Sequence, residues 1–395
     1  MAQPSDASTH LKDVEHEALA QVNALLLKDI SSKLKAYPSM DLTDILQQKL
    51  KTYPALRQVF RDSALQSLEA TSDSVKAPSP PADPRDEYRI PLNVEIIRPL
   101  GPAVLQTVQL DLTADPDDLS AVLPQLNGLV SSSEKIWQLG STAVLGLDSQ
   151  LVMKAGRGID IDHIAIIDYL RQHAPQQLPI PAIHGILHHA DSERFFVFMS
   201  RAPGVPLDSK WKSLTAEQKV PIRDQLDTIV ATFRSIPVQP SEENPRTVLG
   251  GGNPRRCKDA RRDIRVSDEP ISNEAEFNAF ISSNPRRSDT AYISMVRSYL
   301  TTDHKIVMTH GDLHPRNIMV SITPGEPGKV DHVTITALLD WEMCGWYPEY
   351  WEYVKALNTI TLRDGFDDWY AYLPPSIGVW PREHAVDIML SRWHG

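Results

Sequence analysis

The chain has 395 residues, of which 41% are apolar and 23% are charged. This is the composition of an ordinary folded protein, and it excludes collagen-like, low-complexity and wholly disordered chains. The 40 Lys and Arg residues against 51 Asp and Glu residues give a net charge of −11. That excess of negative charge argues against a protein that binds nucleic acid through many phosphate contacts.

No apolar run approaches the roughly 18 residues needed to cross a bilayer. The start of the chain lacks the basic and apolar segments of a secretory signal. The two cysteines, Cys257 and Cys344, are too few for a disulfide framework or a cysteine-based zinc site. We therefore expect a soluble, cytoplasmic protein whose partners include neither membranes nor nucleic acid.

Residues 1–75 carry apolar positions at helical spacing, among them Leu19, Val22 and Leu26. This pattern predicts a helical N-terminal extension, which either packs on the rest of the chain or mediates self-association. Residues 76–92 begin with a stretch rich in Pro, Ser and Asp that has almost nothing to bury. We expect a linker there.

Residues 93–202 read as a small β-rich lobe, because short apolar runs alternate with turn residues such as Gly140. One helical pattern near Asp117 and another over 163–174 interrupt the strands. We expect strands at 93–100, 103–112, 134–140, 141–147, 150–156 and 194–200.

Residues 203–395 read as a mainly helical second lobe. A basic loop at 250–265 interrupts the helices, and 305–340 has a hairpin-like pattern. We expect the loop to be solvated and tied by its own Asp259 and Asp263, and Cys257 to be a small packed side chain.

The sharpest chemical signal is a set of three polar residues in loops bounded by apolar strands: Asp312, Asn317 and Asp340. Phosphoryl transfer needs a carboxylate that orients the attacking hydroxyl, and oxygen ligands for a divalent ion that neutralises the phosphates. Asp312 and Asn317 lie five positions apart in one tight loop, so their side chains can face the same point. Asp340 ends a separate strand and supplies a metal-binding carboxylate.

Each of these residues taken alone is also common as a turn former or a strand-end cap. Their combination resembles the aminoglycoside phosphotransferase and choline kinase family. His310, Gly311, Asp312 and Asn317 match its catalytic loop, and Asp340-Trp341-Glu342 matches its metal-binding motif. The resemblance covers about 137–395, and segments such as CKDARRDIR and PEYWEYVKAL look like fungal-type members.

The resemblance implies an α/β (α+β) protein-kinase-like fold with two lobes, with ATP and Mg²⁺ bound between them. It makes Asp312, His310 and Asn317 catalytic residues, and Asn317 and Asp340 metal ligands. We expect His314 to have a structural role in the same loop.

On the nucleotide side, the resemblance assigns Lys154 to the α- and β-phosphates and the segment around Met199 and Arg201 to the adenine. No glycine-rich G-x-G-x-x-G loop is present, so Ser141 and Thr142 are the candidates to cover the phosphates. The family's helix glutamate, which pairs with the lysine, is replaced by His163, and the adjacent Asp162 is the candidate substitute.

The sequence therefore predicts an ATP-dependent phosphotransferase that acts on a hydroxyl of a small molecule. The alternative is a catalytically weak or inactive kinase-like protein that binds nucleotide as a scaffold. Residues 340–395 contain nine acidic and four basic residues. Together with the aromatic residues there, this charge favours a cationic acceptor. Those aromatic and acidic candidates are Trp341, Trp346, Trp351, Trp369, Tyr370, Asp367 and Asp368.

Overall fold

A computed structural model of the 395-residue chain divides into two compact units, Met1–Ala82 and Asp83–Gly395. The structure describes residues 84–109, 119–174, 178–238, 249–260, 264–283, 290–326, 330–360 and 365–394, together with scattered positions between 19 and 58. The described positions of the first unit are almost all helical. Most of the predicted extension, and any self-association through it, lie outside the described residues. Of the predicted linker 76–92, the described part 84–92 is not a linker, because Tyr88 and Ile90 are buried in the core of the small lobe.

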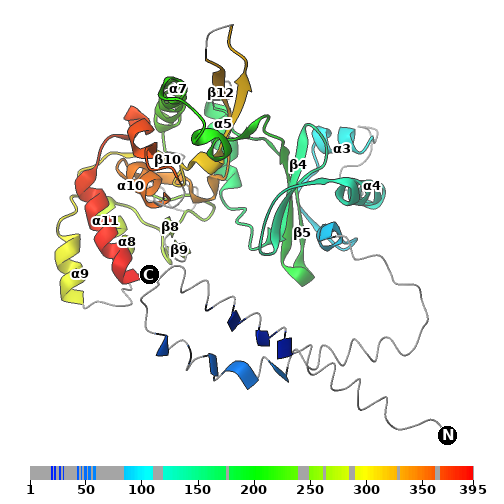
Figure 1. The fold of residues 1–395 in the computed structure, drawn as a ribbon, viewed down its shortest axis with the longest axis horizontal. Helices are drawn as coiled ribbons and strands as arrows, with labels where there is room; N and C mark the ends of the chain where they lie inside the picture. The colour runs from blue at the N-terminus through cyan, green and yellow to red at the C-terminus, as the bar shows by residue number, and fades with distance from the viewer. Residues whose placement is uncertain are drawn as a thin grey trace. The chain divides into compact units, whose positions relative to one another are not determined.

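The small lobe of the second unit is a six-stranded sheet in the order β1-β5-β6-β4-β3-β2, in which neighbouring strands are antiparallel (Figure 1). The strands are β1 (Glu95–Arg98), β2 (Glu134–Leu139), β3 (Thr142–Gly146), β4 (Leu151–Arg157), β5 (Ile183–His189) and β6 (Arg194–Ser200). The helices of this part are α3 (Pro102–Thr107), α4 (Leu119–Ser132) and α5 (Ile164–His173), and 3-10 turns are formed by Pro84–Tyr88 and Ala190–Ser192.

The strand predicted at 103–112 is wrong, because 103–107 belong to helix α3 and 108–109 form a turn, while 110–112 lie outside the described residues. Pro102 occupies the first turn of this helix, where its fixed φ favours helical geometry and its missing N–H costs nothing. The apolar Val104 and Leu105 are buried against the sheet. Burial on a helical face therefore outweighs the strand preference of the β-branched residues.

The two faces of the small sheet have different surroundings. One face packs with α3 and α4 in an apolar core that includes Leu145, Met153 and Phe198. Because successive side chains of a strand point to opposite faces, Lys154 lies on the other face. It faces Val144 of β3 and Val197 of β6. The sheet thus places a lysine on the face opposite its main core.

The second lobe is mainly helical, as predicted (Figure 1). Its helices are α6 (Asp208–Trp211), α7 (Ala216–Arg234), α8 (Glu274–Ile281), α9 (Thr290–Arg297), α10 (Trp351–Asn358) and α11 (Pro381–His394). Its strands are β7 (Val205–Pro206), β8 (Lys258–Ala260), β9 (Ile264–Val266), β10 (Ile306–Thr309), β11 (Ile318–Thr323), β12 (His332–Leu338) and β13 (Gly345–Pro348). Its 3-10 turns are Pro315–Asn317, Trp341–Met343, Trp369–Tyr372 and Pro375–Ile377.

The hairpin-like stretch 305–340 contains one true hairpin, β11–β12, whereas β10 pairs with β13. Its two loops, one before β11 and one after β12, are therefore brought to the same end of neighbouring strands. A backbone bond from Leu339 N–H to Asn317 O (2.8 Å) joins the loops directly.

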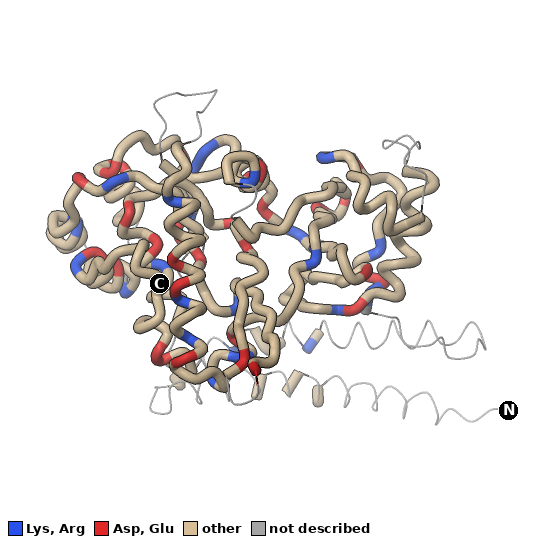
Figure 2. Tube along the Cα trace, turned by 90° about the horizontal axis from the view of Figure 1, so that it is seen from above, with Lys and Arg blue, Asp and Glu red and all other residues tan. Residues whose placement is uncertain are grey.

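Helix α5 joins the two lobes. Ile164 packs against Ile183 and Val197 of the small sheet, whereas Ile166 and Leu170 belong to the core of the second lobe together with Trp341. Positive and negative residues are interspersed along the trace of this unit (Figure 2). In the part of the chain that the structure describes, no helix is long and apolar enough to span a membrane.

Candidate active site

The catalytic-loop residues predicted to face the same point do so. The loop follows β10, and its 3-10 turn begins at Pro315 and ends at Asn317. The Asn317 side-chain N–H groups donate to the backbone oxygen of Asp312 (2.9 Å) and to its carboxylate (2.8 Å). Asn317 therefore holds Asp312 in one orientation.

A residue that the sequence analysis missed also contacts Asp312. The guanidinium of Arg316 donates to both carboxylate oxygens of Asp312, at 2.9 and 2.8 Å. The Arg316 side chain is 47% exposed, so this ion pair lies at the surface, where such pairs are weak. The Arg316 N–H donates to His314 Nδ1 (3.0 Å), in agreement with a structural role for His314.

His310 is fully buried and uses both ring nitrogens on the backbone. Its Nε2 lies 2.9 Å from Leu339 O, and its Nδ1 accepts the Asp312 N–H at 3.2 Å. These partners assign the proton to Nε2. His310 thus joins the catalytic loop to the end of β12 and orients Asp312 through its backbone.

A second missed residue, Glu352 of α10, supports the loop through hydrogen bonds to its backbone. Its fully buried carboxylate accepts the N–H groups of His310 (2.5 Å) and Gly311 (3.3 Å). Burial raises the pKa of Glu352, although His310, Arg234 and the two backbone N–H groups lower it in part. The sequence signal was the second of the two glutamates in PEYWEYVKAL, which stands between aromatic residues.

Asp340 follows β12 with a left-handed backbone conformation (φ 61°, ψ 63°), which is uncommon for a residue with a side chain. Lys154 Nζ lies 3.6 Å from the Asp340 carboxylate and forms an ion pair with Glu342. Burial lowers the pKa of Lys154, but the charges of Asp340 and Glu342 outweigh it and the net shift is upward. Lys154 therefore stays charged beside Asp340 and Glu342.

The expected pairing of Lys154 with Asp162 is not what the structure shows. In the described part of the chain, the carboxylates within ion-pair distance of Lys154 are those of Asp340 and Glu342. Asp162 is exposed, and its N–H donates to the Asp160 carboxylate (2.9 Å). The neighbouring His163 is buried, and its Nδ1 has no hydrogen-bond partner among the described residues.

Ser141 belongs to the two-residue turn that connects β2 and β3, and Thr142 begins β3. Gly140 allows this turn, since its φ is 56°. Met199 lies within β6 and faces Val152 of β4. The Arg201 side chain donates to Asp148 O (3.0 Å) and pairs with Glu134 (2.5 Å), so its guanidinium ties the connection between the lobes to the small sheet.

Three apolar residues that the sequence analysis did not select lie on the Lys154 face of the sheet: Trp137, Val144 and Val152. Trp137 is paired with Val144, which is paired with Lys154. Trp137 is 47% exposed on the edge strand β2. An aromatic ring and two valines beside a lysine form a surface that suits a flat apolar ring with attached phosphates.

The described part of the basic loop is not solvated as expected, although Asp259 does pair with Arg265 of the same loop. Arg255, Lys258 and Asp259 are buried, and Arg255 lies over the ring of Trp346 (4.9 Å). Asp263 lies outside the described residues. Lys258 pairs with Asp160 and Asp259 pairs with Lys355, and a sequence does not reveal such partners, which are 96 or more positions away. Cys257 is buried in an apolar cluster, in agreement with the packed role expected for it.

The aromatic residues after Asp340 are mostly core residues. Trp341, Trp346, Trp351 and Trp369 are at most 2% exposed, whereas Tyr370 is 69% exposed. Of these tryptophans, Trp369 contributes to the lining of the cavity described next, whereas Trp341, Trp346 and Trp351 do not. A cavity of about 610 Å³ is nevertheless lined by Tyr370, Asp367 and Phe366 among others. The Phe366 ring contacts His314 of the catalytic loop edge-on (5.6 Å).

The donor set fits a magnesium ion that is held together with phosphate groups. Among the described residues, no three His, Cys, Asp or Glu side chains form a preformed metal cage. Mg²⁺ is usually held by one or two protein oxygen ligands, substrate phosphates and water. The Asp340 carboxylate and the Asn317 amide oxygen are ligands of this kind.

A family model for the phosphotransferase enzyme family (APH) matches residues 162–382, more than half of the chain. This chain belongs to that family. The matched range contains the catalytic loop and the Asp340 motif. No curated protein matches the chain significantly.

Aminoglycoside phosphotransferases are among the solved structures that are similar to this chain. The GDP complex of aminoglycoside 2'-phosphotransferase-IIIa has 15% identity and a TM-score of 0.43, over 66% of this chain and 81% of that chain. A thermostable mutant of APH(4)-Ia in complex with AMP-PNP and hygromycin B has 14% identity and a TM-score of 0.41, over 66% and 83% of the two chains. Similarity at this level says nothing about which substrate this family member uses.

The expected fold class is confirmed. This member of the phosphotransferase enzyme family has an α/β, two-lobed, protein-kinase-like fold, with a small antiparallel sheet and a mainly helical second lobe. The expectation of a kinase-type phosphotransferase is likewise confirmed at the level of the family.

Proposed function

We propose that this protein transfers the γ-phosphoryl group of ATP to a hydroxyl of a small molecule. The observation that carries the proposal is the convergence of two loops and one strand. The Asp312 carboxylate accepts a hydrogen bond from the Asn317 side chain, and the Asn317 backbone accepts one from Leu339. The next residue, Asp340, faces Lys154. The side chains of Asp312, Asn317, Asp340 and Lys154 supply the groups that phosphoryl transfer needs.

In this proposal, Asp312 accepts a hydrogen bond from the acceptor hydroxyl and orients its oxygen for attack. Asn317 uses its side-chain nitrogen on Asp312, so its Oδ1 is the atom that would bind Mg²⁺ together with the Asp340 carboxylate. When bound, Mg²⁺ neutralises charge on the phosphates. The Lys154 ammonium supplies a further positive charge for the α- and β-phosphates.

The base of ATP would lie on the Lys154 face of the small sheet, against Val144, Val152 and Met199. Trp137 at the edge of this face adds an aromatic surface. Ser141 and Thr142 would cover the phosphates from the turn between β2 and β3. The expectation that this chain is a fungal-type member, taken from segments such as CKDARRDIR, also remains a prediction.

We further propose that the acceptor is cationic. This proposal rests on the acidic residues rather than on the tryptophans. Asp367 and Tyr370 line the cavity whose Phe366 wall touches the catalytic loop. A carboxylate beside an exposed tyrosine ring suits an ammonium group. Amino alcohols and aminoglycosides, tested against neutral sugars, provide the comparison.

One observation supports the alternative, a kinase-like scaffold without catalysis. Arg316 donates to both carboxylate oxygens of Asp312, to which an acceptor hydroxyl has to bind. An ATP-turnover assay with candidate acceptors separates the two functions, since a scaffold binds nucleotide without transfer.

The decisive variant for the proposed function is Asp312→Asn. It keeps the shape of the side chain but loses the charge, so phosphoryl transfer should fall by about 10²–10⁴ while ATP affinity stays nearly unchanged. Asp340→Ala should instead remove the magnesium-dependent part of ATP binding, measured by calorimetry. Unchanged turnover in Asp312→Asn would exclude Asp312 from the mechanism.

A further inference from the structure

Lys258 is a buried lysine that approaches the site from the second lobe, and neither the sequence motifs nor the family match assigns it a function. Its side chain is 5% exposed. Its ammonium group forms an ion pair with Asp160 and donates to the backbone oxygen of Glu342 at 3.1 Å. Burying an ammonium group is costly unless it is paired and hydrogen-bonded, so these contacts define its position.

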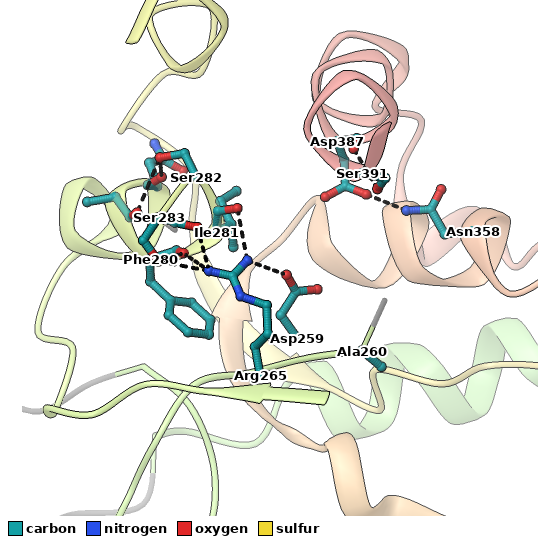
Figure 3. Close-up of polar contacts among 12 residues, drawn as sticks. Asp259, Ala260, Arg265, Phe280, Ile281, Ser282, Ser283, Asn358, Asp387 and Ser391 are labelled. Atoms are coloured by element: carbon teal, nitrogen blue, oxygen red, sulfur yellow. Dashed lines mark hydrogen bonds and ion pairs between the residues drawn. The ribbon is translucent and has the colours of Figure 1, made fainter. Parts of the chain in front are cut away.

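The strand that carries Lys258 is fixed by the residue next to it. Successive side chains of a strand point in opposite directions, and Asp259 points into the lobe, where it is fully buried. It pairs with Lys355 (2.5 Å) and Arg265 (3.5 Å). Figure 3 shows the Arg265 guanidinium between Asp259 and the backbone oxygens of Phe280 and Ile281.

The backbone at Lys258 and in the segment before it is also bound to the rest of the second lobe. The Lys258 N–H donates to Tyr347 Oη (2.9 Å). Gly250 and Trp346 exchange two backbone bonds, at 2.7 and 3.0 Å. A flexible lysine side chain can position another group only if its own origin is fixed, and here the origin is held on both sides.

Two lysines from the two lobes meet at Glu342. Lys154 of β4 pairs with the Glu342 carboxylate, and Lys258 of β8 binds the Glu342 carbonyl. Both contacts lie two residues from Asp340, whose left-handed backbone must be held in place. The same Lys258 ammonium holds Asp160 in the segment between β4 and α5.

We propose that Lys258 is a positioning residue of the phosphotransferase site. It fixes the Asp340–Glu342 loop against the segment that precedes α5, and so determines where Asp340 and Lys154 stand relative to each other. Lys258 makes this link from the second lobe. This inference rests on the proposed function, because it names a residue that prepares the same site.

The test uses the full chain and the variant Lys258→Met, which keeps the length of the side chain and removes its charge. Displacement of the loop by a fraction of an ångström should raise the dissociation constant for ATP with Mg²⁺ by about tenfold. It should lower the rate of ATP hydrolysis with water as acceptor by about 10–100-fold. The Mg²⁺ concentration for half-maximal ATP binding should rise as well.

The double variant Asp160→Asn/Lys258→Met separates positioning from simple charge neutralisation. Lys258→Met alone leaves a carboxylate without its partner, which destabilises the fold. The double variant removes that carboxylate, so its denaturation midpoint should recover toward the wild-type value. Its ATP affinity and Mg²⁺ requirement should remain impaired, because the Glu342 carbonyl still lacks its donor.

Lys219→Met is the matched control. Lys219 is also a buried lysine of the second lobe, and it pairs with Asp368 (2.6 Å) away from Glu342. This variant should lose stability without a change in ATP affinity or hydrolysis.

Two results would overturn the inference. One is wild-type ATP affinity and Mg²⁺ requirement in Lys258→Met, and the other is their full recovery in the double variant. If the wild-type protein itself shows no magnesium-dependent ATP binding, the proposed function fails and this inference falls with it. The wild-type measurement therefore distinguishes the two failures.

Discussion

At the scale of single residues, the site depends on one buried carboxylate that touches no reacting group. Glu352 accepts backbone N–H groups at the start of the catalytic loop. Glu352→Ala removes these acceptors and should lower the free energy of unfolding by about 3–5 kcal/mol. Glu352→Gln keeps one carbonyl oxygen and should cost about 1–3 kcal/mol. Urea denaturation measures both.

The control for Glu352 is Glu349→Gln in the same stretch of chain. Glu349 also accepts a backbone N–H, from Lys305 (3.1 Å), but at an exposed position. It should cost less than about 1 kcal/mol, since water replaces the lost bond. Equal losses for the two glutamines would mean that the burial of Glu352 has no special importance.

His163 gives a prediction about pH at the same scale. Burial lowers its pKa to about 4, with Asp160 and Asp340 raising it and Lys154 and Lys258 lowering it further. The unfolded chain therefore binds this proton more readily. The associated stability is complete above about pH 6.5 and is lost as the pH falls toward 4, by roughly 3 kcal/mol in all.

The measurement compares the free energy of unfolding of the wild-type protein and His163→Gln between pH 7 and pH 4.5. The variant should lack this part of the acid sensitivity, so the two curves should converge as the pH falls. Parallel curves would show that His163 does not titrate in this way.

At the scale of elements, two loops are packed so closely that one position requires glycine. Gly311 has φ 81°, and a Cβ atom there would lie 2.6 Å from Met343 O. Gly311→Ala should therefore destabilise the protein by about 1–3 kcal/mol and reduce turnover, because the catalytic loop has to move away from the Asp340 loop.

Gly128→Ala is the matched control for this glycine. Gly128 lies within helix α4, and a Cβ atom there has nothing within 4 Å. Alanine should stabilise that helix by about 0.5–1 kcal/mol. A neutral result at Gly311, measured by the same denaturation experiment, would contradict the close packing of the two loops.

The elements show what the sequence can and cannot predict. Strands β1, β2, β3, β4 and β6 and helix α5 follow from periodicity, and the contact between Asp312 and Asn317 follows from their five-residue spacing. The partner of Lys154 does not, because Glu342 is 188 positions away and enters through the fold. Glu352 appears in the sequence as part of a helix, but nothing there shows which way its carboxylate points. Such contacts depend on tertiary packing.

At the scale of the whole molecule, helix α5 makes the two lobes of the Asp83–Gly395 unit depend on each other. Ile164 completes the apolar contacts on one face of the small sheet, and Ile166 and Leu170 complete the core of the second lobe. Neither lobe can lose α5 without exposing apolar surface, at roughly 25 cal/mol for each Å². We therefore expect this unit to unfold in a single cooperative transition.

The two cysteines report on this transition from the second lobe. Cys257 and Cys344 are fully buried. Burial raises the pKa of Cys257 and raises that of Cys344 to about 12, so neither thiol should react with a disulfide reagent in the native protein. Both should react in denaturant.

Deuterium uptake by peptides of β4 reports on the small lobe in the same samples. Thiol exposure and β4 exchange should have the same denaturant midpoint, and MgATP should shift both upward together. Exchange of β4 at a lower denaturant concentration than thiol exposure would show that the small lobe opens alone, and that α5 does not couple the two cores.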